Sequence, residues 1–242
     1  MELPAELRCY FEDRALNINS AVLYLKKDSL ENTSASLDNQ LQLYGYTRIF
    51  ECYWIPSQIS DDVRTALIQA LFSLVASRYE SILVSGRNYS CYKHLYSLAI
   101  NCLQCRPNRV LDFGCGTGII MCTQVAEDAL VLKGFDISEN MASLARKKGM
   151  DVLSGQFLVI ADEGPFDIIL ASYVLHYGLN DGEWEVLLAS LTDHGALLGN
   201  FHKEIGLNQA LSKLQHYKGD YKYSVIASPF GSVVAISRGS RG

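Results

Sequence analysis

Three glycines and one aspartate form the clearest candidate site in the chain. The stretch VLDFGCGTG ends an apolar run with Asp112 and then places Gly114, Gly116 and Gly118 at every second position. A glycine loop between a strand and a helix lets backbone amides approach a ligand closely, but alone it does not identify that ligand. The neighbouring residues must therefore decide between a phosphate and another chemical group.

Two phosphate-binding interpretations conflict with the residues around this loop. The dinucleotide fingerprint needs a small third residue, and its two registers place Ile119 or Met121 there. A P-loop needs Gly-Lys-Ser or Gly-Lys-Thr, which does not follow. Asp112 would repel a pyrophosphate, whereas it would favour an ammonium group. The ligand expected here is therefore cationic or zwitterionic.

Short apolar runs alternate with amphipathic segments after residue 106, which predicts an α/β fold. This alternation indicates a doubly wound, mostly parallel seven-stranded sheet. The last two runs are separated only by residues 228–231, too few for a parallel crossover, so they should form an antiparallel hairpin. The predicted strands are 109–113, 130–135, 150–153, 166–171, 195–201, 221–227 and 232–237, and the helices are 118–127, 138–148, 183–190 and 204–216.

The first 105 residues show a different pattern. Helical spacing predicts helices over 61–83 and 89–105, and the aromatic, β-branched stretch 46–55 predicts a strand. Residues 26–40 are polar enough for a loop or a weak helix edge. We expect a mainly helical accessory segment, residues 1–105, before a ligand-binding core, residues 106–242.

The glycine loop resembles the first motif of the class I S-adenosylmethionine-dependent methyltransferase family, hydrophobic-hydrophobic-Asp-x-Gly-x-Gly-x-Gly. The resemblance covers roughly residues 106–238 and implies a Rossmann-like methyltransferase fold with S-adenosyl-L-methionine as cofactor. It places the glycines beneath the methionine part and Asp112 near the amino group. The cofactor contacts that it implies are Asp112, Gly114, Cys115, Gly116, Gly118, Asp136, Ile137, Met141, Gln156, Phe157 and Ser172.

Two further segments carry the adenosine part of this resemblance. GFDISENM (134–141) is similar to the second motif, in which Asp136 would accept both ribose hydroxyls and Ile137 would contact the adenine. Alternatively, Asp136 is only an acid before a helix that Ser138 caps. In SGQF (154–157), Gln156 stands where many members carry an acid, so its contact with the adenine amino group departs from the commonest pattern.

The acceptor side is expected after the fourth strand of the core. FDIILASYVLHY (166–177) resembles the fourth motif, beside the reactive methyl, and makes Tyr173 and His176 the expected catalytic or acceptor-site residues. A structural or surface role is the alternative for His176. In-line methyl transfer relies on proximity and orientation, so a general base is optional. Further candidates to line the acceptor pocket, or simply to pack, are Tyr89, Tyr92, His94 and Tyr96.

Composition and charge indicate which methyl acceptor and which location to expect. The formal charge is −5, and the Asn/Asp-Pro-Pro-Tyr/Phe signature of many amino-methylating enzymes is absent, so a small-molecule acceptor is favoured over nucleic acid. No tract is apolar enough to span a membrane, and no basic and apolar leader opens the chain. Seven cysteines without such a leader indicate reduced thiols and a cytoplasmic location. Alternative functions are a non-catalytic cofactor-binding regulatory or interaction protein and a nicotinamide-dependent oxidoreductase.

A metal site is not expected. Cys102 and Cys105 form the single CxxC pair, no second pair follows at zinc-ribbon spacing, and this pair falls in a helical pattern.

Overall fold

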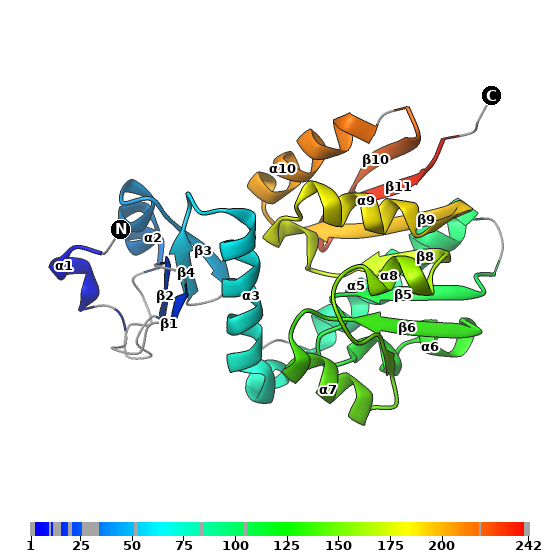
Figure 1. Cartoon of the computed structure of the whole chain (residues 1–242), viewed down its shortest axis with the longest axis horizontal. Coiled ribbons are helices and arrows are strands. Elements are labelled where there is room, and N and C mark those ends of the chain that lie inside the picture. Colours follow the sequence, from blue (N-terminus) through cyan, green and yellow to red (C-terminus); the bar gives the residue numbers. More distant parts are fainter. Residues whose placement is uncertain are drawn as a thin grey trace. The chain divides into compact units, whose positions relative to one another are not determined.

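The computed structural model describes residues 3–9, 11, 16–18, 21–25, 34–50, 53–82, 85–103, 106–217 and 219–239 (Figure 1). The packing of the chain divides it into two compact units, Met1–Leu71 and Phe72–Gly242. Helix α5 (Ser85–Leu103) therefore belongs to the second unit. The functional division expected at residue 106 stays a prediction, because it concerns roles and not packing.

The first unit contains a four-stranded antiparallel sheet in the order β1-β2-β4-β3. Its strands are β1 (Leu16–Ile18), β2 (Ala21–Leu25), β3 (Tyr46–Phe50) and β4 (Tyr53–Pro56). The strand predicted over 46–55 is thus two strands, and β1 and β2 were not predicted because runs this short show no clear period. Helices α1 (Ala5–Arg8) and α2 (Ser34–Leu43) complete this unit, together with the start of α3.

Helix α3 (Asp61–Val75) begins where the sequence predicted. The Ser60 hydroxyl oxygen accepts from the backbone N–H of Val63 (3.4 Å), which satisfies a free amide of the first turn. The continuous helix expected to residue 83 is interrupted by a 3₁₀ turn (Ala76–Arg78) and followed by the short α4 (Tyr79–Ile82). This interruption brings Tyr79 and its neighbour Glu80 to the candidate site.

The second unit contains the predicted sheet, in the strand order β10-β11-β9-β8-β5-β6-β7. Strands β5 to β9 pair in parallel, whereas β11 pairs antiparallel with β9 and with β10, which confirms the terminal hairpin. The strands are β5 (Arg109–Phe113), β6 (Val131–Phe135), β7 (Asp151–Val152), β8 (Phe166–Ala171), β9 (Leu191–Phe201), β10 (Tyr221–Ser228) and β11 (Gly231–Arg238).

Successive strand residues point to opposite faces of this sheet and build two cores. Val110 and Ile168 pack with α5, α6 (Gln124–Asp128) and α7 (Glu139–Lys147). Leu111 and Ile169 pack on the other face with α8 (Val159–Glu163), α9 (Asp181–Ala189) and α10 (Glu204–Leu214). Helices thus cover both faces, which confirms the doubly wound arrangement (Figure 1).

The helix predicted over 118–127 is not continuous. Ile119–Cys122 form a 3₁₀ turn, and α6 begins only after the extended Thr123, whose side chain accepts from the N–H of Val125 (3.3 Å). The helix is interrupted at Thr123, because its side-chain oxygen accepts from the Val125 N–H and so replaces the backbone carbonyl that would accept from it in a continuous helix. Helix α8 was not predicted, since five residues are too few for a helical period.

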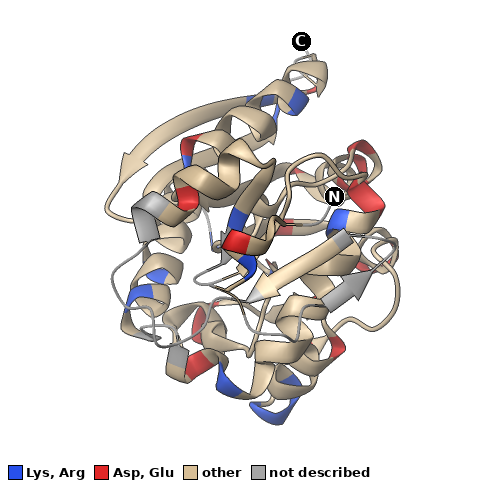
Figure 2. Ribbon diagram, turned by 90° about the vertical axis from the view of Figure 1, so that its left-hand side faces the viewer, with Lys and Arg blue, Asp and Glu red and all other residues tan. Residues whose placement is uncertain are grey.

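Lysine and arginine residues are interspersed with acidic residues along the described ribbon (Figure 2). No single helix among the described residues is long and apolar enough to cross a membrane. Where the structure describes the cysteines, they are free thiols: Cys9, Cys91, Cys102, Cys115 and Cys122. Cys105 lies outside the described residues.

Candidate active site

The glycine loop leaves β5 at its carboxyl end, as predicted. Gly114, Gly116 and Gly118 have φ angles of 73°, 54° and 76°, a left-handed region that strongly favours glycine. A Cβ at Gly114 would lie 2.3 Å from Val174 Cγ2, and one at Gly118 would lie 3.0 Å from the Ala145 Cα. The outer two glycines are therefore required by packing within the protein.

Gly116 differs from the other two because a Cβ would fit there without a clash. The nearest atom to a Cβ built there is Cε1 of the Tyr79 ring, 3.8 Å away, and the residue is half-buried. The packing of the protein itself therefore does not require a glycine at this position, although its positive φ favours one.

Asp136 follows β6 and joins the glycine loop to the next helix. One carboxylate oxygen accepts from the Gly116 N–H (2.8 Å), and the other accepts from the Ser138 N–H (2.8 Å). Ser138 also caps α7, as the structural alternative for this segment predicted. Burial raises the pKa of Asp136 to about 6, although the two backbone amides oppose this shift. Each oxygen keeps a lone pair with which it can accept a ligand hydroxyl.

Asp112 is fully buried at the end of β5. The Tyr92 hydroxyl lies 3.0 Å and 3.1 Å from its two oxygens and donates to them. Burial raises the pKa of Asp112 to about 8, the Tyr92 hydrogen bond lowers it, and the charge of Asp136 raises it further. No ion pair to Asp112 occurs within the described ranges, so the protonated form is favoured without a ligand, and a ligand ammonium would stabilise the ionised form.

Tyr79 and Glu80 belong to the candidate site, although no sequence motif identified them. Burial, followed by the charges of Asp136 and Asp112, raises the pKa of Tyr79, which places its hydroxyl near both carboxylates. Glu80 accepts from the Thr117 hydroxyl (2.6 Å) and pairs with Lys148 at the end of α7. Through Glu80, helix α4 thus makes a hydrogen bond to the glycine loop and an ion pair with the residue that follows α7.

The remaining predicted cofactor residues have different surroundings. The Cys115 thiol is buried and faces the core near Gly134, so that only its backbone belongs to the loop surface. Met141 is buried and Ile137 is half-buried, whereas Gln156 is exposed. Phe157 packs edge-on against Phe113 and Phe135, with ring centroids 5.4 Å and 5.5 Å away. The predicted adenine side is therefore aromatic next to an exposed amide.

Ser172, which the resemblance places among the cofactor contacts, and Tyr173, expected on the acceptor side, follow β8 directly. Tyr173 has φ 57°, the one positive value among the described non-glycine residues. Its N–H donates to Oδ1 of the buried Asn200 (2.7 Å), whose Nδ2 donates to the Phe230 carbonyl (3.0 Å). Asn200 at the end of β9 therefore holds a strained residue in place, and sequence reasoning missed it.

A row of rings runs from the glycine loop to Tyr173. Adjacent members have centroids 4.1 Å to 6.1 Å apart. Both ring nitrogens of His176 are buried without a hydrogen-bond partner, and burial, then His202 and Lys203, hold its pKa well below the ordinary value. His176 is therefore neutral at physiological pH. In order, the ring row contains Tyr79, Phe72, Tyr177, His176, His202 and Tyr173.

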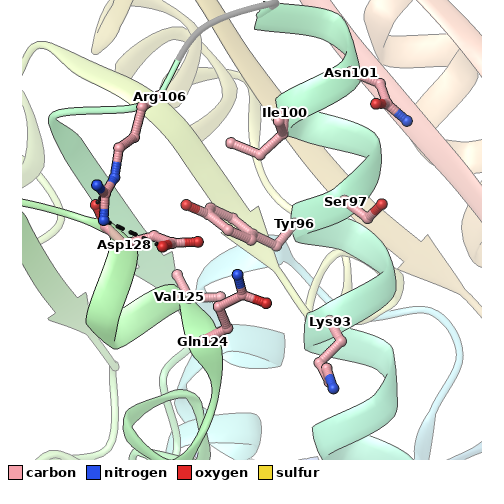
Figure 3. Close-up of a pocket in the computed structure, with 9 residues that line it drawn as sticks. All are labelled: Lys93, Tyr96, Ser97, Ile100, Asn101, Arg106, Gln124, Val125 and Asp128. Atoms are coloured by element: carbon pink, nitrogen blue, oxygen red, sulfur yellow. Dashed lines mark hydrogen bonds and ion pairs between the residues drawn. The ribbon is translucent and has the colours of Figure 1, made fainter.

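A separate pocket of about 830 Å³ lies between α5 and α6 (Figure 3). Arg106 and Asp128 form an ion pair there (3.2 Å) and precede β5 and β6, at the end of the sheet opposite the glycine loop. None of the predicted cofactor or catalytic residues lines this pocket. The lining residues are Lys93, Tyr96, Ser97, Ile100, Asn101, Arg106, Gln124, Val125 and Asp128.

The aromatic residues of α5 that were candidates for the acceptor pocket do not gather in one place. Tyr92 reaches Asp112, whereas Tyr96 lines the pocket between α5 and α6. His94 packs beside Phe230, with ring centroids 5.7 Å apart, and Tyr89 lies beneath the Lys93 ammonium.

Residues 110–195 match the family model of a methyltransferase domain. An uncharacterized methyltransferase of Staphylococcus carnosus is 30% identical over 136 residues, which cover 53% of this chain and 64% of that protein. A trans-aconitate 2-methyltransferase of Mycobacterium ulcerans is 26% identical over 102 residues, which cover 40% of this chain and 39% of that protein. The matches therefore span less than two thirds of either curated relative.

Solved structures show the same fold. DhpI in complex with SAH aligns with a TM-score of 0.56 at 17% identity, over 75% of this chain and all of that chain. The plantazolicin methyltransferase BpumL in complex with SAH aligns with a TM-score of 0.57 at 17% identity, over 74% and 96% of the two chains. These likenesses show that the second unit has the fold of the solved methyltransferases, and the match to the methyltransferase-domain model covers residues 110–195, which contain the glycine loop.

Proposed function

We propose that the protein is a methyltransferase that uses S-adenosyl-L-methionine and acts on a small-molecule acceptor by in-line transfer. One observation carries the proposal. The buried Asp112 and the half-buried Asp136 lie at the ends of adjacent strands, and Asp136 accepts from the amide of Gly116, where a Cβ would meet no atom closer than 3.8 Å. An ammonium and a diol at the two ends of one ligand complement this arrangement.

The residues present fit the cofactor. Asp112 is a buried carboxylate with a raised pKa, and a ligand ammonium would compensate its charge. Asp136 keeps two lone pairs for vicinal ribose hydroxyls, and Phe157 beside Ile137 offers an apolar surface to adenine. When bound, the cofactor supplies an electrophilic methyl group on a sulfonium.

The chain's own part in the reaction is to position the reactants and exclude water. The ring row covers the carboxyl edge of the sheet between the glycine loop and Tyr173, which favours a dry site. Tyr173 and His176 remain the proposed catalytic residues. Neutral His176 has a free nitrogen lone pair for a proton of an acceptor hydroxyl, whereas an already ionised acceptor needs no base.

Two other functions are distinguishable from this one. A non-catalytic regulatory protein would bind the cofactor without transfer. A nicotinamide-dependent oxidoreductase is disfavoured because its pyrophosphate would approach Asp112, and Ile119 and Met121 occupy the place of the small residue.

Isothermal titration with S-adenosylhomocysteine tests cofactor binding, and we expect saturable binding at micromolar concentration. No binding at millimolar concentration would refute the proposal. Transfer of a labelled methyl group from S-adenosylmethionine to a small component of a cell extract tests turnover. Binding without any transfer would favour the regulatory alternative.

We also propose a cytoplasmic location and the role of residues 1–105 as an accessory segment that shapes the acceptor site. The first proposal is supported by the unpaired thiols of the described cysteines. Fractionation of cells that express the tagged full chain tests it, and recovery with membranes would contradict it.

A further inference from the structure

Two hydroxyl groups on the acceptor side make no hydrogen bond of ordinary geometry. Ser172 Oγ and Tyr173 Oη are buried, and the polar groups that act on them are the Cys91 thiol, which is a weak partner, and, for Tyr173, the Arg87 guanidinium. Buried polar groups are rarely left in this state, because desolvation without a new bond is unfavourable. Each hydroxyl can donate one hydrogen bond, so a single ligand group with two acceptor oxygens could satisfy both.

The chain fixes these two donors in advance. They directly follow β8, which lies at the centre of the sheet. Asn200 holds the strained backbone of Tyr173 through a 2.7 Å hydrogen bond and fixes the β10–β11 turn through the Phe230 carbonyl. A positive φ at a tyrosine persists only where the surroundings enforce it, and such strain gathers at ligand sites.

A cation faces the same place from α5. Arg87 is an exposed residue of α5 whose guanidinium interacts with the Tyr173 hydroxyl and lies near Cys91: burial raises the pKa of Tyr173 and of Cys91, and the Arg87 charge lowers both. No ion pair of Arg87 occurs among the described residues. The site therefore combines two hydroxyl donors with a guanidinium that has no anionic partner.

We infer that the acceptor carries a carboxylate, held by the hydroxyls of Ser172 and Tyr173 and by the guanidinium of Arg87. This inference rests on the proposed function, because the same site must hold the cofactor. A carboxylate only accepts hydrogen bonds, and its plane matches the guanidinium fork. A phosphate dianion fits less well, since one guanidinium would leave one of its two negative charges uncompensated.

The test uses the full chain saturated with S-adenosylhomocysteine. Benzoate and hexanoate are titrated against their matched amides, benzamide and hexanamide, and against phenyl phosphate, with binding followed by saturation-transfer NMR. We expect at least one carboxylate to bind about tenfold more tightly than its amide and than phenyl phosphate.

Three substitutions test which residues cause the preference for a carboxylate over its amide. Arg87→Gln should abolish it, Arg87→Lys should retain part of it, and Tyr173→Phe should reduce carboxylate affinity about fivefold. The matched control is Arg106→Gln, which removes a guanidinium already paired with Asp128 in the other pocket and should change affinity less than twofold. Variants are compared only where their affinity for S-adenosylhomocysteine and their melting temperature match those of the unaltered protein. If the Arg87 variants do not fold, Tyr173→Phe still tests the site, because it removes one hydroxyl and retains the aromatic ring that packs there.

The outcomes separate the two proposals. Loss of S-adenosylhomocysteine binding in the unaltered protein would refute the proposed function itself. With that binding intact, equal affinity for carboxylate and amide, preference for phenyl phosphate, or equal effects of the Arg87 and Arg106 variants would overturn the carboxylate assignment.

Discussion

The two halves of the candidate site satisfy their polar groups differently. On the cofactor side, Asp112 accepts from Tyr92 at both oxygens, and Asp136 accepts two backbone amides. On the acceptor side, Ser172, Tyr173 and His176 have buried polar atoms that make no hydrogen bond of ordinary geometry. The cofactor half is thus preorganised by the chain itself, whereas the acceptor half depends on a ligand to complete its hydrogen bonds.

The largest expected effect is the loss of cofactor binding on substitution of Gly116, which lies in the cofactor half of the site. Gly116→Val places a branched side chain against the Tyr79 ring, where the cofactor is proposed to approach the backbone, and should lower affinity for S-adenosylhomocysteine by more than about 100-fold, measured by calorimetry. The left-handed φ of 54° also costs about 1–3 kcal/mol of stability, so the melting temperature should fall moderately. Gly116→Ala is the smaller control, since its Cβ lies 3.8 Å from the nearest atom. Normal affinity of the valine variant would exclude close approach at Gly116.

Asp136→Ala should weaken S-adenosylhomocysteine binding by about 1–3 kcal/mol, because two ribose donors lose a charged acceptor. Calorimetry at constant pH measures this loss. Asp151→Ala is a suitable control, since that carboxylate pairs with Lys133 on the surface. Unchanged affinity in Asp136→Ala would remove this residue from the ribose role.

The raised pKa of Asp112 predicts a pH dependence. The cofactor ammonium pairs with the ionised carboxylate, so affinity for S-adenosylhomocysteine should rise about tenfold between pH 6.5 and 7.5, below the folded pKa of about 8. In the ligand-free protein, a rise in pH should have the opposite effect and lower the stability of the fold. Between about pH 4 and pH 8 the folded state holds a proton that the unfolded state has lost, so the free energy of unfolding should fall as pH rises.

Calorimetry and denaturant unfolding across this pH range measure both slopes for Asp112. Asp112→Asn should flatten both, because asparagine carries no titrating proton. If its slopes match those of the unaltered protein, another group causes them.

The smallest effect belongs to the acceptor half. His176→Leu removes two unpaired buried nitrogens at similar volume and should raise the free energy of unfolding by about 1 kcal/mol, measured with urea. Its affinity for S-adenosylhomocysteine should not change, while methyl transfer should slow. His216→Leu serves as the comparison, since that exposed ring already contacts the Lys213 carbonyl (3.1 Å). A destabilised His176→Leu would show that the ring has partners.

Local chemistry made the cofactor half predictable. Asp112, the three glycines and Asp136 stand in two short segments at strand ends, and parallel strands bring such ends together. All seven strands of the second unit could be predicted because each is an apolar run bounded by a turn or a helix. The terminal hairpin followed from the short connection between its two strands, whereas the order of the strands in the sheet was not predicted.

The residues that complete the site come from distant segments without a motif. Tyr79 reaches the loop because α3 is interrupted at Ala76, and nothing in the helical pattern predicts this break. Asn200 accepts from the backbone N–H of Tyr173, which lies 27 residues earlier in the chain. Arg87 on α5 faces Tyr173 only in the folded chain. Tertiary contact decides these roles, so one sequence cannot assign them.

The hydrogen bond from the Gly116 amide to Asp136 has an evolutionary consequence. It joins the loop after β5 to the end of β6, so both parts of the cofactor half form one rigid body. A substitution at Asp136 would disturb the loop as well as its own ligand contact. Divergent relatives should therefore lose or retain these two motifs together, while Ser172 and Tyr173 remain free to vary with the acceptor.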